Sequence, residues 1–281
     1  WGTSDLFHGS VVMAMALWGT VLGALLGGIP SNKLGRKKTL IFIGIFYVVS
    51  ALGSALVNDP YSFAFFRFIG GVGVGVSTIA APAYISEISP NKYRGRLVAL
   101  FQLSIVLGIL VAFTSNYFFK ALGENAWRWM FGVEVIPAGL YALAVFFVPK
   151  SPRWLMLKKR EEASIKVLTS LHGSEQAIEE AKEIKESIEK DTSIGFKQIF
   201  AKGILPIIVI GAVLSFLQQF TGINAVLYYG ADIFEKALGF GQEDVLAQQV
   251  LLAGVNVAFT ILAMTTVDKW GRKPLIIVGS Y

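Results

Sequence analysis

Long apolar stretches constrain this chain more than any other feature of its sequence. An α-helix needs about 20 apolar residues to cross a bilayer, and seven stretches of that order lie at 9–30, 39–57, 60–86, 97–119, 129–149, 203–231 and 245–267. An eighth begins at Pro274 and continues to Tyr281. Charged residues make up 16% of the chain, against about 25% in average soluble domains. The sequence therefore predicts an all-α, polytopic membrane protein.

The basic residues are unevenly distributed between the loops. Of the 25 Lys and Arg residues, all but Arg67, Lys120, Arg128 and Lys236 lie in loops on one face of the predicted bundle. Cytoplasmic loops carry an excess of Lys and Arg, so this face is predicted to be cytoplasmic and residue 1 extracellular or periplasmic. We expect a multi-pass protein of the plasma or inner membrane, and we attribute the net charge of +6 to topology and not to a nucleic-acid partner.

Charge divides the chain into three parts. Residues 1–149 hold five spans with short connections and are predicted to form an N-terminal helical bundle. The charged segment 150–202 is predicted to be a cytoplasmic helical linker domain, and 203–281 the start of a C-terminal bundle. Because the chain begins at Trp1 with an extracellular end and stops inside an apolar stretch, we expect a fragment that lacks at least one upstream helix and several downstream ones.

The linker contains one segment with helical periodicity, EQAIEEAKEIKESIEK at 175–190. Ile178, Ala181, Ile184 and Ile188 lie at helical spacing there, with charged residues on the other face. This pattern predicts an amphipathic helix on the cytoplasmic side. A solvated spacer is the alternative.

Two loops resemble each other across the chain. NKLGRKKTLIFIG at 32–44 matches DKWGRKPLIIVG at 268–279, and each follows a span that enters the cytoplasm. Internal repeats of several helices are common in secondary transporters, so the match predicts two pseudo-repeated helical bundles. A chance similarity between two basic loops is the alternative.

Glycine and charge within the spans mark two further features. Gly19, Gly23 and Gly27 recur every four residues, a spacing that lets another helix approach closely. Arg67 lies inside a span, where an unpaired guanidinium is costly. Its partner is either Glu134, in a structural bridge, or a carboxylate on an upstream helix that titrates during transport.

Hydrogen-bonding side chains occupy the longest uncharged run, 203–231. Gln218, Gln219 and Asn224 lie in this run together with Gly222. Each amide offers two donors and an acceptor, which a lipid-facing helix does not use. They either face a polar ligand site or cross-link helices.

Several of these stretches resemble the sugar porter family of the major facilitator superfamily, in particular its bacterial xylose–proton symporters and glucose facilitators. The matching segments include NKLGRKK, RFIGGVGVG, YISEISPNKYRGRL, WRWMFGVEVIPA, SPRWL, QQFTGINAVLYY and VDKWGRKP. The resemblance implies a twelve-helix fold, of which helices two to eight and the start of nine are visible. It also implies alternating-access transport of a pentose or hexose with a proton, by a monomer in the lipid bilayer. A facilitated-diffusion uniporter and a non-transporting sugar receptor are the alternatives.

The resemblance also assigns residues to roles. It implies sugar contacts at Gln102, Gln218, Gln219, Asn224, Tyr228 and Asn256. It implies a role in proton coupling for Arg67. A cytoplasmic latch between helices would use Arg36, Glu87, Arg94, Arg153, Asp268 and Arg272. Lys150 departs from the family, which usually has an acid there, so Arg153 needs another partner for its charge.

Other classes of function find little support in the sequence. The chain has no cysteine and only two histidines, His8 and His172, so thiol nucleophiles and the usual His/Cys metal sites are excluded. We therefore expect no enzyme, no cofactor and no metal site. Drug–proton antiporters of the superfamily carry a Gly-Pro motif in the fifth helix, and residues 101–113 contain no proline.

Overall fold

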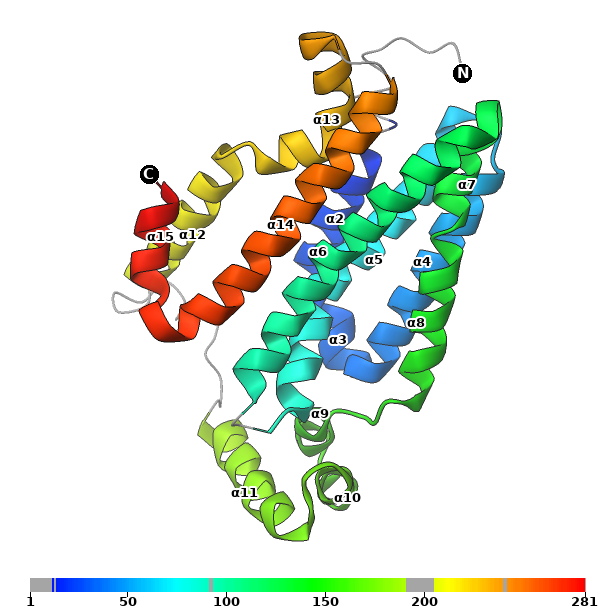
Figure 1. The fold of residues 1–281 in the computed structure, drawn as a ribbon. Helices are drawn as coiled ribbons and strands as arrows, with labels where there is room; N and C mark the ends of the chain where they lie inside the picture. Colours follow the sequence, from blue (N-terminus) through cyan, green and yellow to red (C-terminus); the bar gives the residue numbers. More distant parts are fainter. Residues whose placement is uncertain (1–11, 13, 91–92, 191–204, 240–241, 281) are drawn as a thin grey trace. The chain divides into compact units, whose positions relative to one another are not determined.

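The structure, a computed structural model, describes residues 12, 14–90, 93–190, 205–239 and 242–280. These residues form helices and no β-strand (Figure 1), which confirms the all-α prediction. The chain divides into two compact units: the first comprises Trp1–Ile105 and Phe118–Ile184, and the second Val106–Tyr117 and Lys185–Tyr281. The predicted domain boundaries at residues 149 and 202 stay a prediction.

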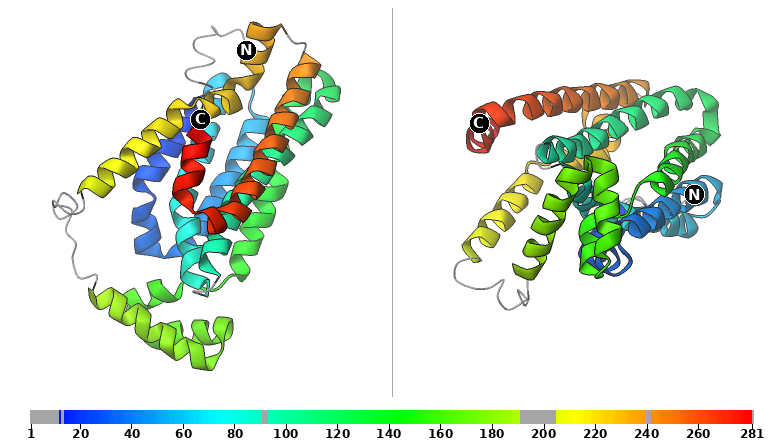
Figure 2. Two further views of the ribbon diagram at one scale, coloured as in Figure 1. Left: turned by 60° about the vertical axis from the view of Figure 1, so that its left-hand side comes forward. Right: turned by 90° about the horizontal axis from the view of Figure 1, so that it is seen from below.

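The first unit is a helical bundle with a small group of helices at one end. Its bundle helices are α2 (Met15–Leu26), α3 (Gly28–Leu34), α4 (Arg36–Leu56), α5 (Pro60–Ile88), α6 (Arg94–Phe119), η2 (Lys120–Asn125), α7 (Ala126–Gly132) and α8 (Val135–Phe147), with 106–117 of α6 assigned to the second unit. They are followed by α9 (Pro152–Leu157), α10 (Glu161–His172) and α11 (Ser174–Lys190). Figure 2 shows α9 and α10 at the end of the bundle where α4 begins and α5 ends.

The second unit contains α12 (Leu205–Phe220), α13 (Ile223–Leu238), α14 (Gln242–Trp270) and α15 (Arg272–Ser280). Four helical segments of the described chain are long and apolar enough to cross a membrane: Arg36–Leu56, Pro60–Ile88, Arg94–Phe147 and Asp244–Val267. The predicted span 97–119 falls within the third segment, and the predicted span 129–149 overlaps it as far as Phe147. The apolar run 203–231 is not one helix, because α12 ends at Phe220 and α13 begins at Ile223.

Close packing of α2 on α5 depends on the glycine ridge. A Cβ atom built on Gly19 would overlap the carbonyl oxygen of Phe68, and one on Gly23 would overlap that of Val72. On the facing helix, a Cβ on Gly75 would overlap the carbonyl oxygen of Thr20. Only glycine allows two helix backbones to approach this closely. The prediction of a close-approach face is therefore confirmed.

Side chains fasten the helices of the first unit at both ends of the bundle. The Lys37 ammonium donates to the carbonyl oxygen of Phe146 at the end of α8, at 2.8 Å. At the other end, Arg128 donates to the carbonyl oxygens of Ala55 and Val57, at 2.8 and 2.9 Å. Carbonyls at helix C-termini have no partner within the helix, so these cations satisfy them and tie neighbouring helices together.

The linker helices have a small core of their own. Leu168 of α10 packs with Ala177 and Ala181 of α11, and Met156 of α9 covers them. The predicted helix over 175–190 is confirmed as α11. The predicted apolar stripe is wrong at Ile178, whose side chain is 68% exposed, because the buried face begins one residue earlier, at Ala177.

Candidate functional site

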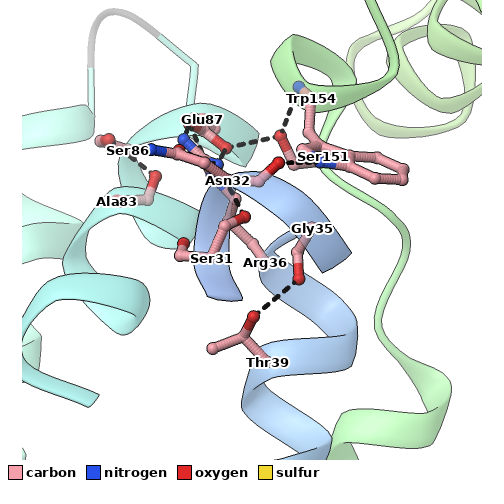
Figure 3. Close-up of polar contacts among 10 residues, drawn as sticks. All are labelled: Ser31, Asn32, Gly35, Arg36, Thr39, Ala83, Ser86, Glu87, Ser151 and Trp154. Carbon is pink, nitrogen blue, oxygen red and sulfur yellow. Dashed lines mark hydrogen bonds and ion pairs between the residues drawn. The ribbon is translucent and has the colours of Figure 1, made fainter. Parts of the chain in front are cut away.

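An ion pair joins the start of α4 to the last turn of α5. The Nε of Arg36 donates to both carboxylate oxygens of Glu87, at 3.1 and 3.0 Å, and Nη2 lies 2.9 Å from Oε1 (Figure 3). The two side chains are 11% and 9% exposed. Gly35, with a φ of 88°, separates α3 from α4 and lets α4 begin at Arg36. Two predicted latch residues are thus in direct contact.

The remaining nitrogen of Arg36 binds the preceding helix. Its Nη1 donates to the carbonyl oxygen of Ser31 and to the Oδ1 of Asn32, each at 2.9 Å. One guanidinium therefore connects α3, α4 and α5. The amide oxygen of Asn32 accepts this bond without adding a second negative charge, so Arg36 and Glu87 remain matched one to one.

The start of α9 completes the arrangement. The hydroxyl of Ser151 donates to Oε2 of Glu87 at 2.5 Å, and it accepts the backbone N–H of Trp154 as the helix cap. The indole Nε1–H of Trp154 donates to the carbonyl oxygen of Asn32 at 3.0 Å, and its ring packs on Gly35. We call Ser31, Asn32, Arg36, Glu87, Ser151 and Trp154 the helix-end network. Sequence reasoning missed the roles of Ser151 and Trp154, although both lie in the SPRWL motif.

Of the other four predicted latch residues, two lie in the first unit and two in the second. Arg94 and Arg153 line a cavity of about 120 Å³ beside Glu87, together with Ser86, Ser89, Leu168, Glu180, Glu183 and Ile184. The side chains of Asp268 and Arg272 lie outside the described residues. Their part in the latch stays a prediction.

Arg67 contacts an aromatic ring inside the first unit. Its Cζ lies 5.1 Å from the centroid of Phe131, a cation–π distance. Among the described carboxylates, none forms an ion pair with it. Glu134, its candidate partner, lines a cavity of about 370 Å³ with Tyr47, Ser50 and Tyr141. The role of Arg67 in proton coupling stays a prediction.

The amide side chains of the second unit lie at the break between α12 and α13. Gly222 has a φ of 78°, a backbone conformation that glycine adopts most readily. The Asn224 Nδ2 donates to the Oε1 of Gln219 across this break, at 2.6 Å. Gln218, Gln219 and Asn224 are all exposed, so further amide donors and acceptors remain able to meet a ligand.

A cavity of about 470 Å³ begins next to the break. That volume is within the range of small-molecule sites, about 300–1,000 Å³. It lies between the first residue of α13 and one face of α14, lined by Ile223, Gln248, Leu251, Leu252, Val255, Asn256 and Phe259. The lining combines two amides with aliphatic and aromatic surface, a combination that suits a molecule with both hydroxyls and C–H faces. Gln248 was not predicted, although it lies two helical turns before Asn256 on the same face.

Of the six predicted sugar contacts, Asn256 lines this cavity, and Gln218, Gln219 and Asn224 lie at the α12–α13 break. The positions of the other two relative to the cavity are not described. Gln102 lies on α6 in the part assigned to the first unit. Tyr228 lies on α13, and its side chain is outside the described residues. Both assignments stay predictions.

Comparison with known proteins gives this geometry its context. A family model described as “Sugar (and other) transporter” matches residues 4–281. The chain belongs to the sugar porter family. It is 38% identical over 291 residues to a glucose transport protein of Synechocystis, covering 99% of this chain and 62% of that protein. It is 37% identical over 293 residues to the D-xylose-proton symporter of Escherichia coli K12, covering 95% of this chain and 59% of the symporter.

A solved structure shows the same fold. The sugar porter chain superposes with a TM-score of 0.84 on a proton:xylose symporter of the major facilitator superfamily bound to 6-bromo-6-deoxy-D-glucose, at 35% identity, covering 98% of this chain and 63% of that one. The predicted major facilitator fold is confirmed, as is a multi-pass membrane protein. The chain spans about three fifths of the length of the curated relatives it matches.

Proposed function

We propose that this sugar porter chain forms part of a transporter that carries a monosaccharide, a pentose or hexose, across the membrane by alternating access. A proton is the proposed co-substrate, and the protein is proposed to act as a carrier and not as an enzyme. The names of its relatives support the substrate class, since they include glucose, D-xylose-proton and galactose-proton transporters.

The proposal rests on one observation: three amide side chains lie together at the α12–α13 break, beside the cavity on α14. In the proposed site, Gln218, Gln219 and Asn224 bind sugar hydroxyls, and Asn256 binds them from within the cavity. Paired amides suit a sugar because each hydroxyl both donates and accepts. A site with such groups discriminates strongly against analogues that lack the hydroxyl. Gln102 and Tyr228 are proposed to join it.

The helix-end network is proposed to stabilise one of the two access states. A ligand shifts an equilibrium between states only through different affinities for them, so the energy that separates the states must come from contacts such as this network. Arg67 is proposed to couple the proton. Arg94, Arg153, Asp268 and Arg272 are proposed to extend the latch. We propose that the protein acts as a monomer in the lipid bilayer.

Uptake by the full-length parent protein in proteoliposomes tests the function. We expect radiolabelled xylose or glucose to accumulate against its gradient when the outside is acidic, and a protonophore to abolish that accumulation. Uptake that reaches only equilibrium indicates a uniporter, and binding without flux indicates a sugar receptor. Absence of flux and of binding for every pentose and hexose contradicts the proposal.

A further inference from the structure

Gln248 of α14 is one of two residues with polar side chains among the described residues that line the cavity of about 470 Å³. The other is Asn256, and both side chains are partly buried. The rest of the described lining is aliphatic or aromatic. Hydroxyl groups of a molecule in this cavity therefore have two amides to bind, and the family resemblance assigned a role to only one of them.

The distance between the two amides suits one sugar ring. Gln248 and Asn256 are eight positions apart on one continuous helix, which is about 12 Å along the axis at about 1.5 Å per residue. Side chains on a helix lean in the same direction along its axis, so the amides keep roughly this spacing. A hydrogen bond occupies about 3 Å at each end, which leaves about 6 Å between two hydroxyl oxygens. Hydroxyls on opposite sides of one monosaccharide ring span a distance of that order.

The surface between the two amides is apolar. Leu251, Leu252 and Val255 lie between Gln248 and Asn256 in the sequence and line the same cavity. A sugar ring carries C–H groups on its faces, and this surface can cover them while hydroxyls at the rim reach the amides. Binding sites commonly combine apolar lining with a few polar groups that fix the orientation of the ligand. Two amides at opposite ends fix that orientation better than one.

The amide of Asn256 remains available to a ligand. The hydroxyl of Thr260, one turn further along α14, donates to the backbone carbonyl oxygen of Asn256 at 2.8 Å. The same hydroxyl is 3.5 Å from the Oδ1 of Asn256, which is long for a hydrogen bond between two oxygens. Thr260 therefore satisfies the backbone and leaves the side chain of Asn256 to the cavity.

We propose that Gln248 is a specificity-determining residue, whose amide binds a hydroxyl on the opposite side of the sugar ring from the hydroxyl bound by Asn256. An analogue that lacks the first hydroxyl leaves the amide of Gln248 without its partner and binds more weakly. This inference rests on the proposed function, because it adds a contact to the same sugar site.

Competition with deoxy sugars tests the inference in the full-length protein in proteoliposomes. Monodeoxy analogues of the transported sugar, D-glucose or D-xylose, compete with uptake of that radiolabelled sugar. For the parent protein we expect at least two analogues to bind roughly tenfold more weakly than the sugar itself, the effect of one lost hydrogen bond each. In Gln248→Leu, one of these analogues should bind as well as the sugar, because no amide remains to distinguish them. In Asn256→Leu, a different analogue should do so.

Two further variants make the result independent of one substitution. Gln248→Asn withdraws the amide by one methylene group, so it should change the selectivity for the same analogue to a smaller extent. Gln249→Leu is the matched control, because Gln249 is the adjacent glutamine, also partly buried, and is not among the described residues that line the cavity. Its order of preference among the analogues should equal that of the parent.

The outcomes separate this inference from the proposed function. A parent protein that transports the sugar while Gln248→Leu keeps the parent's preference among analogues overturns the role of Gln248 alone. The same holds if Gln248→Leu and Asn256→Leu lose discrimination against the same analogue, since the two amides would then not bind opposite sides of the ring. A parent protein that neither binds nor transports any pentose or hexose contradicts the proposed function itself.

Discussion

Replacing Arg36 with alanine destabilises the first unit by about 3–5 kcal/mol, the usual result of removing one partner from a buried ion pair. Glu87 then keeps its charge at 9% exposure, with the hydroxyl of Ser151 as a remaining donor. The carbonyl oxygen of Ser31 and the amide oxygen of Asn32 also lose their donor. The cost therefore comes mainly from the Glu87 carboxylate, which loses the guanidinium and keeps one hydroxyl donor, because Asn32 is exposed and its amide oxygen can bind water instead.

Unfolding of the purified protein in detergent measures this cost, and Lys38→Ala is the matched control. Lys38 is a basic residue in the same turn of α4, and it is exposed, so its replacement should change stability by less than about 0.5 kcal/mol. The Arg36→Ala, Glu87→Ala double variant should recover part of the loss, because no charge remains buried. Equal stability of the Arg36→Ala and Lys38→Ala proteins would show that the pair contributes nothing.

Replacing Gly23 with alanine separates α2 from α5. The new methyl group would overlap the carbonyl oxygen of Val72 and lie 3.0 Å from the Cα of Gly75. These are backbone atoms, which cannot move aside without shifting a whole helix. Overpacking of this kind costs about 3 kcal/mol, and the better helix propensity of alanine returns about 1 kcal/mol. We expect a net loss of about 2 kcal/mol, seen as a lower unfolding temperature.

Gly28→Ala is the control for Gly23→Ala, and we expect it to change stability in the opposite direction. A Cβ at Gly28 meets no atom within 4 Å, so only the gain in helix propensity remains and stability should rise slightly. If both substitutions raise stability, the close approach of α2 and α5 is not needed for folding.

Repetitive features of the sequence predicted much of the fold. The apolar spans, the glycine ridge and the helix over 175–190 depend on periodicity and length, which a single sequence displays directly. The face of α11 was harder to predict, because Ile178 and Ala177 are adjacent and only the partner helix decides which of them is buried. Tertiary packing against Leu168 selected the smaller residue.

The candidate sites were predictable only in part, for a different physical reason. Arg36 and Glu87 were expected to take part in a cytoplasmic latch, because the family resemblance assigned both residues to it. The contributions of Ser151 and Trp154 depend on a cap hydroxyl and an indole N–H reaching residues 64 and 122 positions away. Such contacts leave no periodic trace in the sequence. Gln248 was missed likewise, because its importance follows from the cavity it shares with Asn256.

Transport by a variant without the amide pair tests the central claim most directly. In the full-length protein, Gln218→Ala with Asn224→Ala removes two groups at the α12–α13 break, and Gln176→Ala with Asn125→Ala removes the same chemistry from exposed positions outside the spans. At about 1 kcal/mol or more for each lost hydrogen bond, we predict a loss of at least about tenfold in kcat/KM for sugar uptake by the first protein. The control protein should transport normally. Full uptake by the Gln218→Ala, Asn224→Ala protein would contradict a sugar site at this break.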